Sequence, residues 1–113
     1  MMKSPSQNIE ERRYHKVATV DEIAPGSGKK VEIGDNEIAI FHFNGEFYAI
    51  DDLCPHRGAP LSEGFLEAGK VFCPWHCFDF ILRTGECVTV PSLHVQAYEV
   101  KVEGEDVFVL CRG

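Results

Sequence analysis

The chain has 113 residues, a length that suits one small domain. Its 18 acidic residues outnumber its 11 basic ones, and the net charge of −7 argues against binding to nucleic acid or to an anionic membrane, whose phosphates would repel the chain. No run approaches the roughly 18 apolar residues of a membrane span. The opening residues also lack the apolar stretch of a secretory signal. We therefore expect a cytoplasmic protein.

The first part of the chain predicts a tail followed by β-structure. Residues 1–13 are polar and predict a flexible N-terminal tail, which leaves 14–113 as a single domain. The segment VDEIAPGSG predicts a short helical turn that Pro25 and Gly26 end. The stretch KKVEIGDNEIAI then predicts a turn at Gly34-Asp35-Asn36.

Three further segments predict β-hairpins. In the clearest, EIAIFHFNGEFYAI, apolar runs flank Asn44-Gly45, a pair whose residues both accept positive φ. The segment FDFILRTGECVTV predicts a second hairpin around Thr84-Gly85, and QAYEVKVEGEDVFVLC a third that turns at 103–105. No segment has a sustained helical period. Short strands separated by frequent turns therefore predict an all-β fold, a small sandwich or barrel.

The run 54–80 interrupts this strand pattern and indicates a loop-rich insertion between two β halves. It contains Cys54-Pro-His56 and, after sixteen residues, Cys73-Pro-Trp-His76. The five cysteines are odd in number and no secretory signal precedes them, which favours metal ligation over a disulfide framework. Two centres fit these residues: a structural zinc with four tetrahedral ligands, or a Rieske cluster with one cysteine and one histidine from each loop. Packing alone is the third interpretation.

The motifs CPHRGAPLSEG (54–64) and CPWHCFDF (73–80), with the gap between them, resemble those of the Rieske ferredoxin family. The resemblance extends over roughly 17–110. It implies a fold of three antiparallel sheets with a [2Fe-2S] cluster at the tip of an inserted subdomain, at about 52–92. It also implies that two cysteines bind the inner iron and two histidines the outer iron, namely Cys54, Cys73, His56 and His76.

The resemblance also separates branches of the family. Respiratory and photosynthetic members have an additional cysteine in each loop, and these pair as a disulfide, but Ala59 and Trp75 stand at the matching positions here. Those members also carry hydroxyl donors to the cluster sulfurs where this chain has Phe78 and Phe80. Fewer donors destabilise the more negative reduced cluster. The resemblance therefore implies a small soluble ferredoxin with a potential in the lower part of the Rieske range of about −150 to +300 mV.

By this resemblance the chain is a monomeric one-electron carrier. A flavin-containing NAD(P)H reductase would reduce it, and a terminal oxygenase would accept the electron. An alternative is the small subunit of an assimilatory NAD(P)H nitrite reductase, which resembles the same fold and length, and a zinc-stabilised β module is a further one. The sequence contains no nucleophile and base with a supporting third group, so we expect no catalysis by the chain alone.

Other residues near the motifs have two interpretations each. Arg57 and Trp75 either form a docking rim or are a solvated charge and a hydrophobic lid. The segment 90–92 matches the family's proline loop over the cluster, although Pro91 could simply end a strand. Cys77 stands where the family commonly has glycine and is either a small buried apolar residue, the favoured interpretation, or a partly exposed thiol that oxidises or competes for iron during assembly. A role for His94 beside the ligands stays open, while Cys87 and Cys111 are expected in the core and His42 in a sheet.

Overall fold

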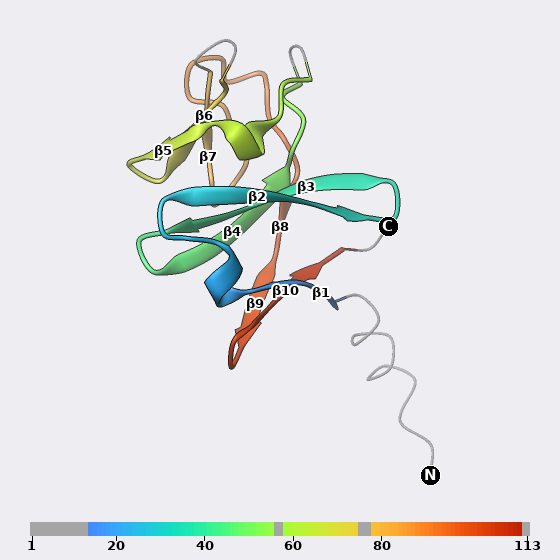
Figure 1. Ribbon diagram of the computed structural model, residues 1–113. Coiled ribbons are helices and arrows are strands. Elements are labelled where there is room, and N and C mark those ends of the chain that lie inside the picture. The colour runs from blue at the N-terminus through green and yellow to red at the C-terminus, as the bar shows by residue number, and fades with distance from the viewer. Residues whose placement is uncertain (1–13, 56–57, 75–77, 112–113) are drawn as a thin grey trace.

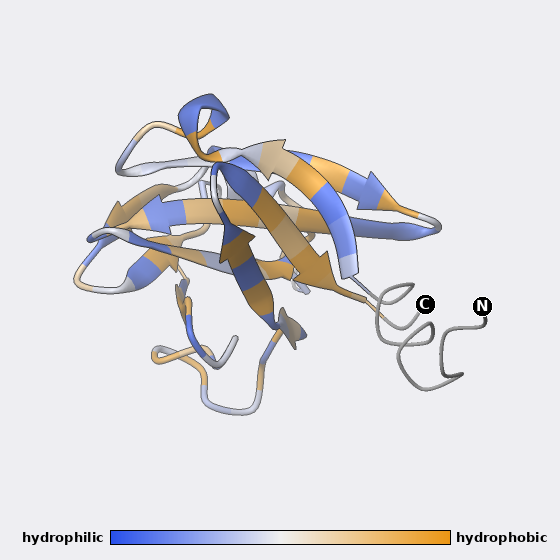
Figure 2. Ribbon diagram, turned by 90° about the horizontal axis from the view of Figure 1, so that it is seen from below, coloured by the Kyte–Doolittle hydropathy of each residue, from blue (hydrophilic) through white to orange (hydrophobic). Residues whose placement is uncertain are grey.

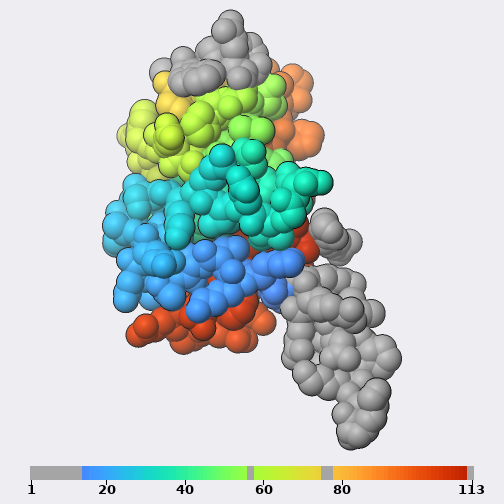
Figure 3. Space-filling model, turned by 45° about the vertical axis from the view of Figure 1, so that its right-hand side comes forward, coloured from blue at the N-terminus to red at the C-terminus, as the bar shows by residue number. Residues whose placement is uncertain are grey.

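The computed structural model describes residues 14–55, 58–74 and 78–111, so the predicted tail at 1–13 lies outside the described residues. Three antiparallel sheets make up the fold, as the sequence analysis expected. Figure 3 shows them stacked along the molecule, with the sheet of β5–β7 at one end and the β9–β10 hairpin at the other. No helix among these residues is long and apolar enough to cross a membrane.

The first sheet has the order β1-β10-β9 and joins the two ends of the described chain. Strand β1 (Tyr14–Thr19) pairs with β10 (Asp106–Leu110), which forms a hairpin with β9 (Val100–Glu103). The turn of that hairpin lies at 104–105, within the predicted turn. The short helix η1 (Val20–Glu22) leads away from β1 and ends before Pro25, as predicted.

The second sheet has the order β2-β3-β4-β8 and lies in the middle of the molecule (Figure 1). Its strands are β2 (Ser27–Ile33), β3 (Asn36–Phe43), β4 (Glu46–Asp51) and β8 (Ala97–Tyr98). The turn between β3 and β4 consists of Asn44 and Gly45, with φ angles of 55° and 81°. These positive angles are those that the Asn-Gly pair predicts.

Strand β3 is buried on both faces and contributes to two separate hydrophobic cores. Ile38 and Ile40 belong to the core shared with β1 and β10, whereas Ala39 and Phe41 belong to the core that contains the two loop cysteines. All four side chains are fully buried. Figure 2 shows hydrophobic and hydrophilic bands alternating along many of the strands around it. The sheet of β3 is therefore the layer on which both ends of the domain pack.

The third sheet, β5-β6-β7, gives the predicted insertion more regular structure than the sequence indicated. It follows the helix η2 (Leu61–Glu63) and consists of β5 (Phe65–Glu67), β6 (Lys70–Phe72) and β7 (Asp79–Ile81). The β5–β6 turn was not predicted because Ala68, with φ of 55°, occupies a left-handed position that alanine rarely adopts. The range 52–92 for the whole subdomain stays a prediction.

The predicted hairpin around Thr84-Gly85 is only partly regular. The chain turns there, but the returning arm makes isolated bridges, Phe80 to Cys87 and Glu86 to His94, in place of a continuous strand. Cys87 therefore lies at a bridge, not within a strand. Cys111 likewise follows the end of β10 by one residue. Both cysteines are buried, so the prediction that they belong to the core is confirmed.

Candidate metal centre

Two loops of similar construction carry the predicted cysteine ligands. In the first, which follows β4, the Cys54 N–H donates to the carbonyl of Ala59 at 2.9 Å, and the Gly58 N–H donates to the Cys54 carbonyl at 2.7 Å. In the second, which follows β6, the Cys73 N–H donates to the Phe78 carbonyl at 2.8 Å. In both loops the cysteine N–H thus bonds to the carbonyl five positions later. Each cysteine is fixed at the base of a short closed loop.

Both cysteines point into one hydrophobic core. Cys54 and Cys73 are each 1% exposed and belong to the same buried cluster. Neither cysteine forms a disulfide. Two buried thiols from two matching loops fit a centre that takes one sulfur ligand from each loop.

Three of the residues that separate the branches of the family lie in or against this same core, whereas Trp75 is outside the described residues. Ala59 and Phe80 are fully buried within it, and Phe78 packs against it. Ala59 thus places a methyl group, and Phe80 an aromatic ring, where a thiol or a hydroxyl would make the core more polar. Neither side chain can donate a hydrogen bond.

Several predicted site residues lie outside the described residues. These are the two histidine ligands, the two candidates for a docking rim and the unusual cysteine, namely His56, His76, Arg57, Trp75 and Cys77. Within 14–55, 58–74 and 78–111, no group of three or more histidine, cysteine or acidic side chains is placed to hold a metal ion. The full ligand set therefore stays a prediction, of which Cys54 and Cys73 are the described half.

The segment predicted to be a proline loop packs beside the cysteines. Val90 and Leu93 pack against the core that contains both thiols, while Pro91 is exposed. The Val90 N–H donates to Cys87 Sγ at 3.3 Å, and the Leu93 N–H donates to the Val90 carbonyl at 2.9 Å. The segment is thus a compact turn with its apolar side chains on the core.

The sequence analysis did not single out Asp79, a buried acid between Phe78 and Phe80. Its Oδ1 accepts hydrogen bonds from the Thr89 N–H at 3.0 Å and the Thr89 hydroxyl at 2.6 Å, and its Oδ2 pairs with Lys70 Nζ at 3.0 Å. Burial alone would raise the pKa of Asp79, but the bonds from Thr89 and Lys70 outweigh burial and lower it. The only sequence signal was an acid flanked by two large apolar residues in a predicted strand.

The described histidines near this region differ in their surroundings. His42 is a sheet residue, as predicted: its Nδ1 lies 2.8 Å from the Ile23 carbonyl, and its ring stacks on Phe47. His94 is exposed and forms a bridge with Glu86, and its role beside the ligands stays a prediction.

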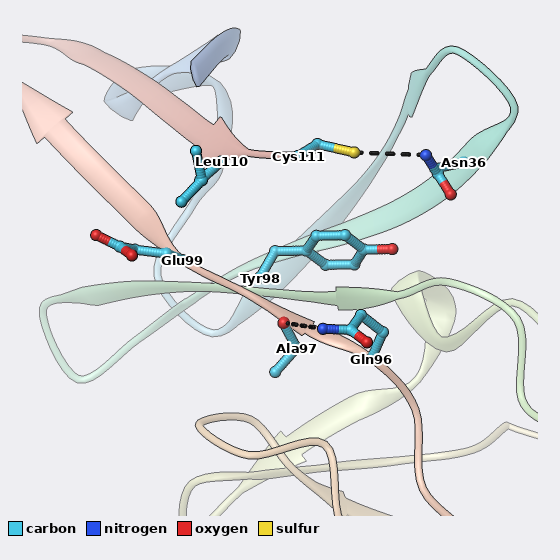
Figure 4. Close-up of a pocket in the computed structure, with 7 residues that line it drawn as sticks. All are labelled: Asn36, Gln96, Ala97, Tyr98, Glu99, Leu110 and Cys111. Carbon is cyan, nitrogen blue, oxygen red and sulfur yellow. Dashed lines mark hydrogen bonds between the residues drawn. The ribbon is translucent and has the colours of Figure 1, made fainter. Parts of the chain in front are cut away.

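A hollow lies between the first two sheets. It has a volume of about 440 Å³, and Figure 4 shows Asn36 donating to Cys111 Sγ across it, at 3.4 Å. The Tyr98 hydroxyl donates to Asp51 Oδ1 at 2.7 Å. Burial, together with this carboxylate, raises the pKa of Tyr98 far above its usual value. No residue that lines this hollow is a predicted cluster ligand.

The fold and the two cysteine loops define the class to which the chain belongs. The family model described as the Rieske [2Fe-2S] domain matches residues 13–99. The chain therefore belongs to the Rieske [2Fe-2S] domain family, as its motifs indicated. It is an electron-transfer component, not a catalyst in itself, and its cofactor is a Rieske [2Fe-2S] cluster with cysteine and histidine ligands.

Individual proteins place the chain more closely within the family. It is 41% identical over 95 residues to the 3-phenylpropionate/cinnamic acid dioxygenase ferredoxin subunit of Photorhabdus laumondii, covering 82% of this chain and 90% of the relative. A solved complex of reduced oxygenase and oxidized ferredoxin in carbazole 1,9a-dioxygenase contains a chain that is 31% identical, with a TM-score of 0.79 and coverages of 87% and 93%. A putative NADH-dependent nitrite reductase small subunit from Mycobacterium tuberculosis is 26% identical, with a TM-score of 0.80 and coverages of 85% and 92%.

Proposed function

We propose that this chain is the ferredoxin of a multicomponent oxygenase system. It accepts one electron from a flavin-containing NAD(P)H reductase and passes it to a terminal oxygenase. The observation that carries the proposal is the pair of matching loops at Cys54 and Cys73, which place two buried thiols in one core of a small domain. The names of the dioxygenase ferredoxin subunit and of the ferredoxin in the oxygenase complex support the same role. We further propose that it acts in the cytoplasm as a monomer.

The proposed ligands are Cys54 and Cys73 on the inner iron and His56 and His76 on the outer iron. When bound, the cluster supplies reversible one-electron chemistry. The chain contributes the two thiolates, the closed loops that fix their direction, and an apolar core that separates them from water. Thiolate ligands must be deprotonated, so loading of the cluster releases protons from these cysteines.

The same core supports a low reduction potential. The reduced cluster carries one more negative charge than the oxidised cluster, and hydrogen bonds to its sulfurs favour the reduced state. Phe80, fully buried in this core, has no hydrogen to donate. The excess of acidic residues in the chain acts in the same direction.

Buried cysteines offer an internally matched test, because Cys54 and Cys73 lie in one core and Cys111 in the other. We expect Cys54→Ser and Cys73→Ser to lose iron and the red-brown colour after purification. Cys111→Ser introduces the same change at a buried position in the other core and is expected to keep the iron. Full iron content in Cys54→Ser or Cys73→Ser would contradict the proposed ligands.

A second candidate function is the small subunit of a nitrite reductase, favoured by the similarity to the Mycobacterium tuberculosis protein. Stopped-flow mixing separates the two functions. The reduced protein is mixed with the terminal oxygenase of a 3-phenylpropionate dioxygenase system or with a nitrite reductase large subunit, and oxidation of the cluster is followed by absorbance. Rapid oxidation by the oxygenase alone supports the proposal, and rapid oxidation by the large subunit alone supports the second candidate.

A further inference from the structure

The carboxylate of Asp79 joins three segments of the tip of the domain. Asp79 lies on β7, Lys70 on β6, and Thr89 on the segment that connects β7 to β8. The Asp79 side chain is only 8% exposed and that of Lys70 27%, so this ion pair is partly shielded from solvent. Hydrogen bonds to a buried charged acceptor are among the stronger ones in proteins.

The same segment is attached to Asp79 through the main chain. The Val88 N–H donates to the Asp79 carbonyl at 2.9 Å, next to the two bonds that Thr89 makes with the side chain. The turn after Thr89 closes on itself, because the Cys87 N–H donates to the Leu93 carbonyl at 3.2 Å. The turn 87–93 is therefore a compact unit that Asp79 holds at one end.

This turn packs against the cysteine core. Val90 and Leu93 contact the cluster of buried residues that includes Cys54 and Cys73. If the turn moved away, that part of the core would meet water. Among the contacts described above, the bond from the Thr89 hydroxyl can be removed with little change of shape, because threonine and valine are nearly isosteric.

We propose that Asp79, Thr89 and Lys70 are positioning residues that hold the turn 87–93 against the cysteine core, keep water from the bound cluster and thereby lower its reduction potential. The proposal rests on Cys54 and Cys73 being cluster ligands. Water stabilises the more negative reduced cluster, so easier access of water raises the potential. Lys70 balances the charge of Asp79, so the pair adds little net charge. These residues therefore affect the reduction potential chiefly by holding the turn in place.

The direct test compares Thr89→Val with Thr89→Ser. Valine removes the hydroxyl donor but keeps the shape and every charge, whereas serine keeps the donor. Loss of one bond of about 1.4 kcal/mol increases the population of the open turn about tenfold. We expect amide hydrogen exchange at residues 89 and 90, and the rate of iron loss to a chelator, to rise by about that factor in Thr89→Val. The reduction potential should shift upward in Thr89→Val and stay unchanged in Thr89→Ser.

Lysine substitutions control for electrostatics. Lys70→Gln and Lys16→Gln change the net charge equally, but Lys16 lies on β1 and pairs with Asp106 in the first sheet, whereas Lys70 pairs with Asp79. We expect faster iron loss in Lys70→Gln alone. The proposal is overturned if Thr89→Val keeps the exchange rates, the iron-loss rate and the potential of the unsubstituted protein, or if Lys16→Gln has the same effect as Lys70→Gln. Amide exchange does not depend on which residues bind iron, so it separates failure of this proposal from failure of the proposed ligands.

Discussion

Substitution of Gly64 by alanine tests how closely the helix η2 must approach β6, the strand that leads into Cys73. Gly64 has an ordinary φ of −76°, so no unusual backbone conformation requires glycine there. A Cβ atom added at this position would lie 2.1 Å from the Phe72 carbonyl oxygen and 3.1 Å from Val71 Cγ2. The glycine is therefore needed for close approach to the backbone immediately before a proposed ligand.

The cost follows from this distance. The two backbones must separate by about 1 Å to make room, and a gap of that size forfeits up to about half of the contact energy of the atoms involved. Overpacking of this kind costs about 1–3 kcal/mol. In a domain of this size, a loss of about 2 kcal/mol lowers the melting temperature by about 8–16 °C. We also expect lower iron content, because the strain falls on Phe72, next to Cys73.

Gly45→Ala is the matched control for Gly64→Ala. Gly45 has a φ of 81° and nothing within 4 Å of an added Cβ, so its substitution costs only the left-handed strain of about 1 kcal/mol. Calorimetric melting temperatures and iron assays of both variants provide the measurement. The reasoning is refuted if Gly64→Ala melts as the unsubstituted protein does, or if Gly45→Ala is the more destabilised of the two.

The remaining predictions concern the cysteine core and its surroundings. The pKa of Asp79 is lowered by folding, so its stabilising contribution is present above the unfolded pKa near 3.8 and is lost as the pH falls through the folded pKa. Asp79→Asn should therefore flatten the fall of melting temperature below about pH 4, and an unchanged profile would count against the described bonds. Phe80→Tyr should raise the reduction potential in voltammetry by placing a hydroxyl in the core, and an equal or lower potential would contradict this. Phe41→Ala should cost about 3–5 kcal/mol in denaturant unfolding, and a loss below 1 kcal/mol would mean that Phe41 does not support the core.

Turns in the first two sheets could be predicted from the sequence, because each depends on residues that are neighbours in the chain. Asn44-Gly45 predicted a hairpin, and both residues have the positive φ that such a turn needs. The continuous burial of β3 could not be deduced from its pattern alone, because a short apolar run is compatible with several elements. Whether one face of β3 or both faces are buried depends on the other sheets, which are formed by segments distant in the sequence.

The third sheet, β5-β6-β7, was harder to predict. Its β5–β6 hairpin turns at Ala68-Gly69, and alanine gives little indication of a positive φ. Asp79 was also missed, because its partners lie nine residues before it and ten after it and meet only in the folded chain. The two loop cysteines were predicted to come together from their spacing and family resemblance, and they do share one core.

The most direct test of the account is the metal content and the electron paramagnetic resonance spectrum of the purified protein after reduction with dithionite. The account predicts two irons and two acid-labile sulfides per chain, as in a Rieske [2Fe-2S] domain, and the spectrum of a cluster with mixed cysteine and histidine ligation. A colourless protein that contains one zinc, has no acid-labile sulfide and gives no such spectrum would contradict it.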